Sequence, residues 1–303
     1  MLTKTGALSL YTDLTNNAET RNQTTGLIYI NQGIRLLLGS MEWPFLERSF
    51  VQDSVAGQQV YNIPVPVKKV VAVSVKIGTY TYTPRQVFSQ DDWNFLNTPT
   101  DVTGDVTSYY FVKDNQVYLW PKPATSGNEI TINALTQVRD ISKDDYVTGT
   151  VSAVANGGTT ITGSGTTWTA GMVGSYISIT NTNAANVGDG FWYQITDVPS
   201  TTSLTISRPY AGTSIVAGAA TYTIGDVMII PQDYQLAPVY YAAAMYWRAQ
   251  GDQGRSVDYM NTFEMTKAQM HGDEGLRTTS PSVDDGFNDM YPVNPNLLPK
   301  FTP

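Results

Sequence analysis

The fold begins with residues 26–45, which contain the run Gly26-Leu27-Ile28-Tyr29-Ile30-Asn31-Gln32-Gly33-Ile34 and end in Trp43-Pro44-Phe45. Apolar residues recur here at three- and four-residue steps, the period of an amphipathic helix. A threonine at position 24 or 25 can cap the start of this helix, and Gly39 can end it. The two aromatic residues that follow are expected to anchor the exit of the helix into a core.

Helical spacing returns near the other end of the sequence, after Ile229-Ile230-Pro231-Gln232-Asp233. A long helix is expected from there, and a second one over about residues 257–270. The first and last helices are predicted to share one body. Its core or subunit-packing residues are Leu27, Ile30, Ile34, Leu37, Trp43, Phe45, Leu236, Tyr240, Ala243 and Trp247.

Strand signals dominate between these helices. The alternation of Val71, Val73, Val75 and Ile77 predicts a strand with those four side chains on one face. Two further strands flank residues 113–115, which are read as a three-residue hairpin loop. We expect residues 84–105 to be loop-like.

The composition changes from Val147 to Gly225, where Gly, Thr, Ser, Ala and Asn prevail and no lysine occurs. Short strand-like runs separated by glycine turns are typical of a small β-sandwich or barrel. The predicted fold class is therefore α+β: a helical-bundle body with a β region, an inserted all-β sandwich or barrel-like domain, and an extended C-terminal tail. The predicted domains are 1–146 with 226–271, then 147–225, then 272–303.

Bulk properties exclude several classes of protein. The chain has 303 residues and a net charge of −8, with no basic run that would grip nucleic acid tightly. It has no cysteine, which excludes disulfides, thiolate zinc sites and a cysteine nucleophile. No signal peptide and no membrane span are expected, because no apolar run approaches the necessary length.

The candidate chemistry is weak. His271 is the only histidine, and its place at the predicted end of a helix favours a structural role over a catalytic triad. The acid pairs at 91–92, 144–145 and 284–285 do not match a calcium loop. The glycines at 163 and 165 lack the lysine and the following helix of a phosphate loop. We therefore predict no enzyme activity, no cofactor and no metal.

The aromatic residues of the 147–225 block allow two interpretations. Trp168, Trp192, Tyr193 and Tyr210 could form a sugar-binding face. Filling the core of a small β-domain is the commoner role for such rings, and it is the interpretation favoured here.

The order of the parts resembles the head-to-tail adaptor (connector) proteins of tailed bacteriophages. The resemblance covers roughly residues 20–145 and 226–271. It is carried by the 26–34 run with Trp43-Pro44-Phe45, and by Tyr61-Asn62-Ile63-Pro64, Leu119-Trp120-Pro121-Lys122-Pro123, Ile230-Pro231-Gln232-Asp233-Tyr234 and Ala242-Ala243-Ala244-Met245-Tyr246-Trp247. The 147–225 block looks like a module that recurs in phage structural proteins.

The resemblance implies a virion protein that is made in the host cytoplasm and sits at the neck, where head meets tail. It implies a dodecameric ring that binds the portal, extends the DNA channel and gives the tail or nozzle a docking platform. Genomic DNA would pass without sequence-specific binding, and no membrane is involved. In that family the C-terminal segment reaches into the portal, which assigns portal docking here to Tyr291, Leu297, Leu298 and Phe301.

Two alternatives stay open at the level of the sequence. The chain could be another neck or tail part, such as a tail-tube, tail-completion or fibre-attachment protein. It could instead bind glycans through the 147–225 block, although cleaving them would require two carboxylates facing one sugar, and the block is poor in acids.

Overall fold

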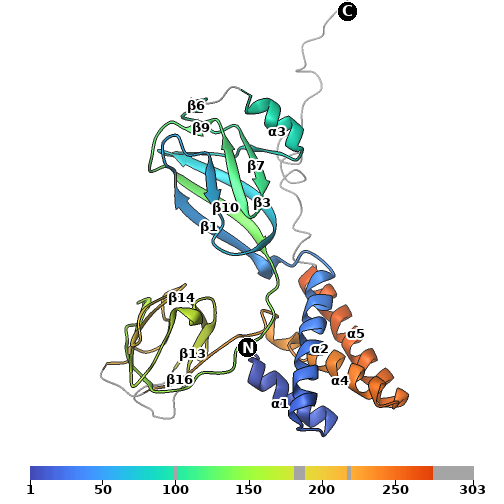
Figure 1. Cartoon of the computed structure of the whole chain (residues 1–303). Coiled ribbons are helices and arrows are strands. Elements are labelled where there is room, and N and C mark those ends of the chain that lie inside the picture. Colours follow the sequence, from blue (N-terminus) through green and yellow to red (C-terminus); the bar gives the residue numbers. More distant parts are fainter. Residues whose placement is uncertain (99–101, 181–187, 217–219, 276–303) are drawn as a thin grey trace, which may run out of the picture. The chain divides into compact units, whose positions relative to one another are not determined.

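The computed structural model describes residues 1–98, 102–180, 188–216 and 220–275 (Figure 1). Over these residues the protein has five α-helices and several β-sheets, which confirms the mixed α+β class. Contacts divide the chain into two compact units. Unit 1 consists of Met1–Gly39 and Val138–Ala268, and unit 2 consists of Ser40–Gln137 and the described residues from Gln269 onward.

This division differs from the predicted one, which groups residues 40–137 with the helices. The physical reason is that the strands of unit 2 have a core of their own, made only from residues 61–134. Strands that bury each other need no helix to cover them.

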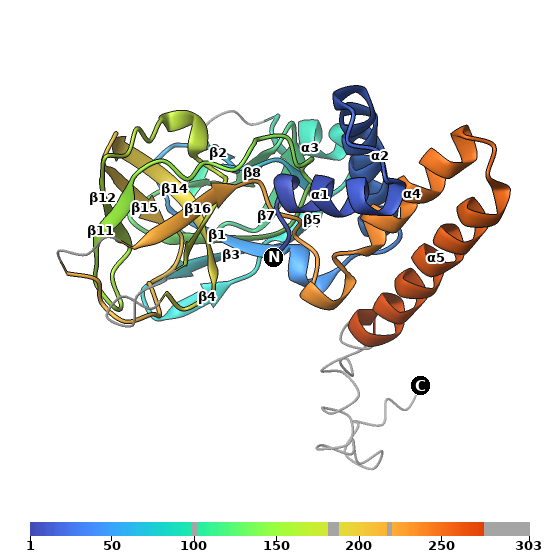
Figure 2. The ribbon, with the colours of Figure 1, turned by 90° about the horizontal axis from the view of Figure 1, so that it is seen from below.

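The helices of unit 1 pack on one another (Figures 1 and 2). Helix α1 is capped by Thr3, whose side chain accepts a hydrogen bond from the backbone N–H of Gly6. Helix α2 begins before the predicted cap, at Thr20. The helices are α1 (Lys4–Thr15), α2 (Thr20–Gly39), α4 (Ala237–Ala249) and α5 (Gln253–Gly275).

Two glycines explain why α2 can approach its neighbours so closely. A Cβ on Gly26 would lie 2.3 Å from the ring of Tyr11 in α1, and a Cβ on Gly33 would lie 3.0 Å from Pro238 Cα in α4. Neither position has room for a side chain. These glycines therefore set the spacing of the helices.

Helix α5 packs on α4 through few residues. The ring of Phe263 lies 5.3 Å from that of Tyr241, and Ser256 Oγ donates a hydrogen bond of 3.0 Å to the carbonyl of Ala244. Ser256, Phe263 and Met270 are buried at seven-residue intervals, whereas Val257 and Met265 are exposed. The buried side chains of α5 thus form a narrow stripe.

The inserted block forms one curved six-stranded sheet, a half-barrel, with strand order β11-β12-β15-β14-β13-β16 (Figure 2). An isolated bridge between Val151 and Ala220 brings the β11 side of the sheet towards the β16 side, with hydrogen bonds of 2.9 and 3.1 Å. A separate core fills it. The strands are β11 (Thr150–Val154), β12 (Thr160–Ser164), β13 (Tyr176–Thr180), β14 (Trp192–Ser200), β15 (Ser203–Ile206) and β16 (Thr221–Gly225).

Unit 2 contains two four-stranded sheets with orders β1-β10-β3-β4 and β2-β8-β7-β5. Buried residues from both sheets, including Val73, Ile132 and Leu119, belong to one core. The strands are β1 (Glu47–Asp53), β2 (Val60–Asn62), β3 (Val67–Ile77), β4 (Tyr80–Tyr82), β5 (Arg85–Val87), β7 (Tyr109–Lys113), β8 (Gln116–Trp120) and β10 (Glu129–Thr136), with a small pair β6 (Thr103–Gly104) and β9 (Lys122–Pro123).

The predicted face of β3 is wrong at one residue. Val73 and Val75 are buried as expected, but Val71 is 44% exposed and Val70 is buried in its place. The register explains this, because Asn133 pairs with Ala72 and Ala134 with Val70, leaving Val71 as a bulge. One extra residue moves the side chains that precede it to the other face.

Two local predictions for unit 2 need correction. The hairpin between β7 and β8 is confirmed, but its turn contains only Asp114 and Asn115, both at positive φ. Within the supposed loop 84–105 lies helix α3 (Gln90–Leu96), which starts at Ser89, where the hydroxyl accepts hydrogen bonds from the backbone N–H groups of Asp91 and Asp92. A serine cap followed by acids is the signal that could have predicted α3.

Candidate functional site

The predicted packing residues of the helices occupy different environments. Ile30, Ile34, Leu37 and Ala243 are buried, and Leu27, Tyr240 and Trp247 are half-buried. Leu236 precedes the first turn of α4 and is 42% exposed. The apolar face of α4 is instead centred on Val239 and Ala242–Ala244, which are fully buried.

Trp43 and Phe45 lie in unit 2, apart from the other eight residues of this group. Their rings stack with centroids 5.7 Å apart, with Trp43 at the start of the 3-10 turn Pro44–Leu46 and Phe45 within it. The ring of His271 lies 5.0 Å from that of Trp43, and its Nε2 lies 2.9 Å from Ser40 Oγ. A histidine packed edge-on against a buried tryptophan fits the structural role predicted for it.

The four residues assigned to portal docking, Tyr291, Leu297, Leu298 and Phe301, lie outside the described residues. Their role stays a prediction. Of the four candidate sugar-binding rings, Trp168, Tyr193 and Tyr210 are almost fully buried in the half-barrel, and Trp192 is half-buried. Burial, followed by the nearby charge of Asp189, raises the pKa of Tyr210 to about 12.

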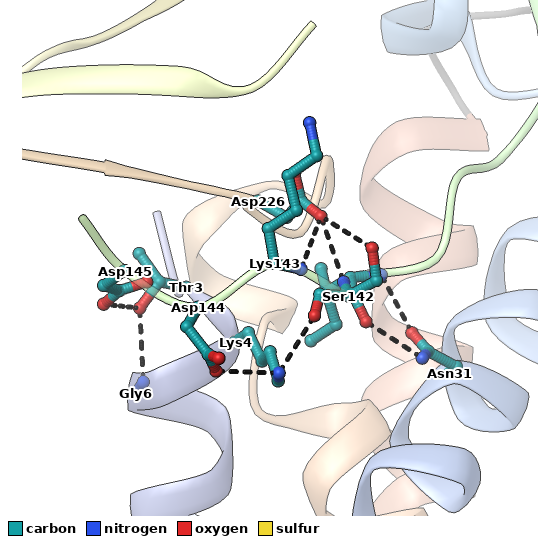
Figure 3. Close-up of polar contacts among 10 residues, drawn as sticks. Thr3, Lys4, Gly6, Asn31, Ser142, Lys143, Asp144, Asp145 and Asp226 are labelled. Carbon is teal, nitrogen blue, oxygen red and sulfur yellow. Dashed lines mark hydrogen bonds and ion pairs between the residues drawn. The ribbon is translucent and has the colours of Figure 1, made fainter. Parts of the chain in front are cut away.

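The densest polar site of unit 1 joins the start of the half-barrel to the helices, and we call it the polar junction (Figure 3). It consists of Thr3, Lys4, Asn31, Ser142, Lys143, Asp144, Asp145 and Asp226. The acid pair 144–145 lies at this boundary. Local patterns carry no signal for the partners of that pair, because Lys4 and Thr3 lie 140 and 142 residues away in the chain.

Asp226 is the centre of the junction. Its Oδ2 accepts hydrogen bonds from the backbone N–H of Ser142 (3.0 Å), the backbone N–H of Lys143 (2.9 Å) and the hydroxyl of Ser142 (3.1 Å). Its Oδ1 accepts one from Ser175 Oγ at 3.2 Å. Burial alone would raise the pKa of Asp226, but the backbone N–H groups of Lys143 and Ser142, together with the charge of Lys143, hold this pKa below its ordinary value.

Lys143 extends this network into the half-barrel. Its Nζ donates to the carbonyl of Gly171 at 2.6 Å and to Ser175 Oγ at 3.0 Å. On the other side, Lys4 Nζ of α1 donates to the carbonyl of Ser142 (2.9 Å) and to Asp144 (2.8 Å). Residues 142–144, which lead into the half-barrel, are thus hydrogen-bonded to α1 through Lys4 and to the half-barrel through Lys143.

The junction also contacts α2 and the start of α1. Asn31 exchanges two hydrogen bonds with the backbone of Ile141, at 3.1 and 3.0 Å. Thr3 Oγ1 donates to Asp145 Oδ2 at 2.8 Å (Figure 3). Gly225 leaves room for this carboxylate, since a Cβ there would lie 2.6 Å from Asp145 Oδ1. The arrangement holds the segment that enters the half-barrel in place against α1 and α2.

Unit 2 carries two surface features that the sequence did not reveal. Phe88 and Phe95 are 84% and 80% exposed beside a cavity of about 440 Å³ between β5 and α3. A second cavity of about 500 Å³, which we call the Trp43 groove, is lined by Met41, Glu42, Trp43, Pro44, Glu47, Val71 and Leu135. The β3 bulge that exposes Val71 contributes to this groove.

Among the described residues, no group of three or more His, Cys, Asp or Glu side chains could hold a metal ion. Within the same part of the chain, no helix is long and apolar enough to cross a bilayer.

Comparison with known proteins gives one family. Residues 6–156 match the model of the SU10 adaptor protein family, and no curated protein matches the chain. The matched region runs from α1 through both sheets of unit 2 to the first strand of the half-barrel. Over these residues the chain is similar to SU10 adaptor proteins, which supports a phage structural protein of the adaptor type.

Proposed function

We propose that this chain is a non-enzymatic virion protein that forms a ring between portal and tail, a head-to-tail adaptor. The observation that carries the proposal is the adaptor-family match over residues 6–156, which spans both units of the structure. The ring, a dodecamer in this proposal, extends the DNA channel at the neck and presents a docking platform to the tail or nozzle.

The parts of the chain receive separate roles in the proposal. Residues 1–146 with 226–271 form the adaptor body, in which the helical bundle packs within and between subunits. Residues 147–225 project from the body as a separately folded domain. The predicted tail 272–303, whose first four residues belong to α5, reaches the portal, with Tyr291, Leu297, Leu298 and Phe301 as anchors.

Surface properties support a protein that contacts other proteins rather than DNA. The pair Phe88 and Phe95 exposes a large apolar surface, a feature that often marks interaction sites. The net charge of −8 suits a wall past which DNA slides without being held, since tight binding to phosphates needs clustered cations.

The proposal is tested by mixing the purified chain with its portal and imaging the product by electron microscopy. We expect monomers or weakly associated chains alone, and a single ring beneath the portal in the mixture. Rings of another symmetry that form without portal, or density further down the tail, would favour a different neck or tail part.

The role of the C-terminal segment is tested by deleting residues 280–303. We expect portal docking to be lost while the circular dichroism spectrum shows that the rest of the chain keeps its fold. A full-length variant with Tyr291, Leu297, Leu298 and Phe301 changed to serine should behave like the deletion. Its matched control changes Val283 and Phe287 to serine, and docking that is equal in all of these proteins contradicts the assignment.

A further inference from the structure

The Trp43 groove combines an apolar floor with an acidic rim. Trp43 and Leu135 are buried in its wall, and Val71, exposed by the bulge, adds an aliphatic side chain. Glu42 and Glu47 stand at its edge. An apolar cavity with acids at its rim favours an occupant that carries apolar side chains next to a cation.

The two acids at the rim differ in whether they already form an ion pair. Glu42 pairs with Lys69 of β3 at 3.1 Å. Glu47, the first residue of β1, is exposed, and among the described residues it has no ion pair. Glu47 therefore offers the charge that a cationic occupant would meet.

The chain after Gly275 carries two cations, Arg277 and Lys300, and of these Lys300 lies among several apolar side chains. Residues 297–301 read Leu297-Leu298-Pro299-Lys300-Phe301, a single cation among apolar side chains. The preceding part, residues 281–293, carries three aspartates and no cation, so the acidic rim would repel it. Charge thus distinguishes the last seven residues from the acidic stretch 281–293 that precedes them.

The tail starts beside the groove. His271 of α5 lies in unit 2 with its ring 5.0 Å from that of Trp43, and α5 ends four residues later at Gly275. From Gly275 to Leu297 the chain has 22 residues, which span at most about 75 Å when fully extended. A tether anchored at the wall of the groove makes docking an intramolecular event, which raises the effective concentration of the occupant.

We propose that residues 297–303 dock into the Trp43 groove of their own chain, with Leu297, Leu298 and Phe301 against the apolar floor and Lys300 against Glu47. In the free subunit the groove holds the end of the tail. This contact needs no portal and no ring, so it stands or falls independently of the assembly role proposed above.

The experiment uses the absence of cysteine from the natural chain. The full-length double variant Val71→Cys/Thr302→Cys places one thiol in the groove and one beside Lys300. Mild oxidation of the dilute protein, followed by non-reducing electrophoresis and peptide mapping by mass spectrometry, measures the yield of the disulfide. We expect the main product to be a link within one chain.

The matched control is Tyr80→Cys/Thr302→Cys. Tyr80 is 70% exposed on β4 of the same sheet, several residues away from the groove. We expect at least about fivefold less linkage there than at position 71, a difference of about 1 kcal/mol in favour of the docked tail. Equal yields at the two positions, or links only between chains, overturn the proposal.

A charge exchange in the Val71→Cys/Thr302→Cys background tests Glu47 directly. Glu47→Lys, like Lys300→Glu, should lower the linkage about fivefold, and the two changes together should restore it. Loss of linkage in both single variants without rescue in the combination would show that the pairing of Lys300 with Glu47 is wrong.

Discussion

Asp226 shows how much a single carboxylate can organise. It follows the last strand of the half-barrel, and its oxygens accept four hydrogen bonds from Ser142, Lys143 and Ser175. Hydrogen bonds to a charged group are stronger than those between neutral groups. Asp226 therefore joins the segment that leaves the half-barrel to Ser142 and Lys143 in the segment that enters it.

We expect Asp226→Asn to lower the free energy of unfolding at pH 7 by about 1.5–3 kcal/mol, because the charge that these donors face is lost. The pKa of Asp226 is lower in the folded protein than in the unfolded chain. Its contribution is therefore complete above the unfolded pKa of about 3.9 and is lost as the pH falls through the folded pKa. Urea denaturation at pH 7 and at about pH 3 should show a smaller difference between variant and wild type at the lower pH.

The control for this variant is Asp144→Asn. Asp144 pairs with Lys4 at 2.8 Å, but its side chain is largely exposed, and an exposed ion pair contributes little. This change should alter the free energy of unfolding by less than about 1 kcal/mol. An Asp226→Asn loss that is the same at both pH values would contradict the charge argument.

Residue periodicity predicted most of what β3 buries, but not the bulge. Val73 and Val75 follow the alternation, whereas Val71 is exposed because the register slips opposite Asn133 and Ala134. A bulge depends on the partner strand, which lies about 60 residues away. Periodicity within one strand carries no information about that partner.

At the scale of elements, α2 depends on two glycines, and Gly26 provides the clearer test. In Gly26→Ala the new methyl would lie 2.3 Å from the ring of Tyr11, so α1 and α2 must separate or the ring must move. We expect a loss of about 1–3 kcal/mol in the free energy of unfolding, measured by urea denaturation followed by circular dichroism.

Gly39→Ala is the matched control in the same helix. A Cβ there meets nothing within 4 Å, so this change should leave stability within about 1 kcal/mol of the wild type. If both alanine variants were equally stable, close approach of the helices would not be the reason for glycine at position 26.

The candidate sites show a similar limit at this scale. Local signals predicted the β7–β8 hairpin and would have predicted α3 from its Ser89 cap. The polar junction and the Trp43 groove could not be predicted, because each joins residues from elements far apart in sequence. Sequence patterns describe single elements, whereas both of these sites arise from tertiary packing.

At the scale of the whole molecule, the half-barrel has a core of its own. Its buried residues, among them Trp168, Tyr193 and Ile224, all come from residues 151–224. We predict that a fragment of residues 144–226 folds alone, because a core of this kind needs no residue from the helices. Urea unfolding followed by tryptophan fluorescence should give a single cooperative transition.

Two variants of the fragment sharpen this prediction. Trp168 is 1% exposed and donates a hydrogen bond of 2.9 Å to Tyr222, so Trp168→Ala should lower the free energy of unfolding by about 3–5 kcal/mol. Val216 is 81% exposed, so Val216→Ala should change it by less than about 0.5 kcal/mol. A fragment with no cooperative transition would show that the block depends on the rest of the chain.

The pairing of Tyr146 with Ile224 has a consequence for the history of such a chain. Their backbones exchange hydrogen bonds of 2.7 and 2.9 Å, so the block starts and finishes at neighbouring points. Recombination could remove the 79 residues 147–225, or replace them with another domain whose ends are equally close, without displacing the helices that precede and follow them. Protein engineers could insert a foreign domain between the same two neighbouring points of the backbone.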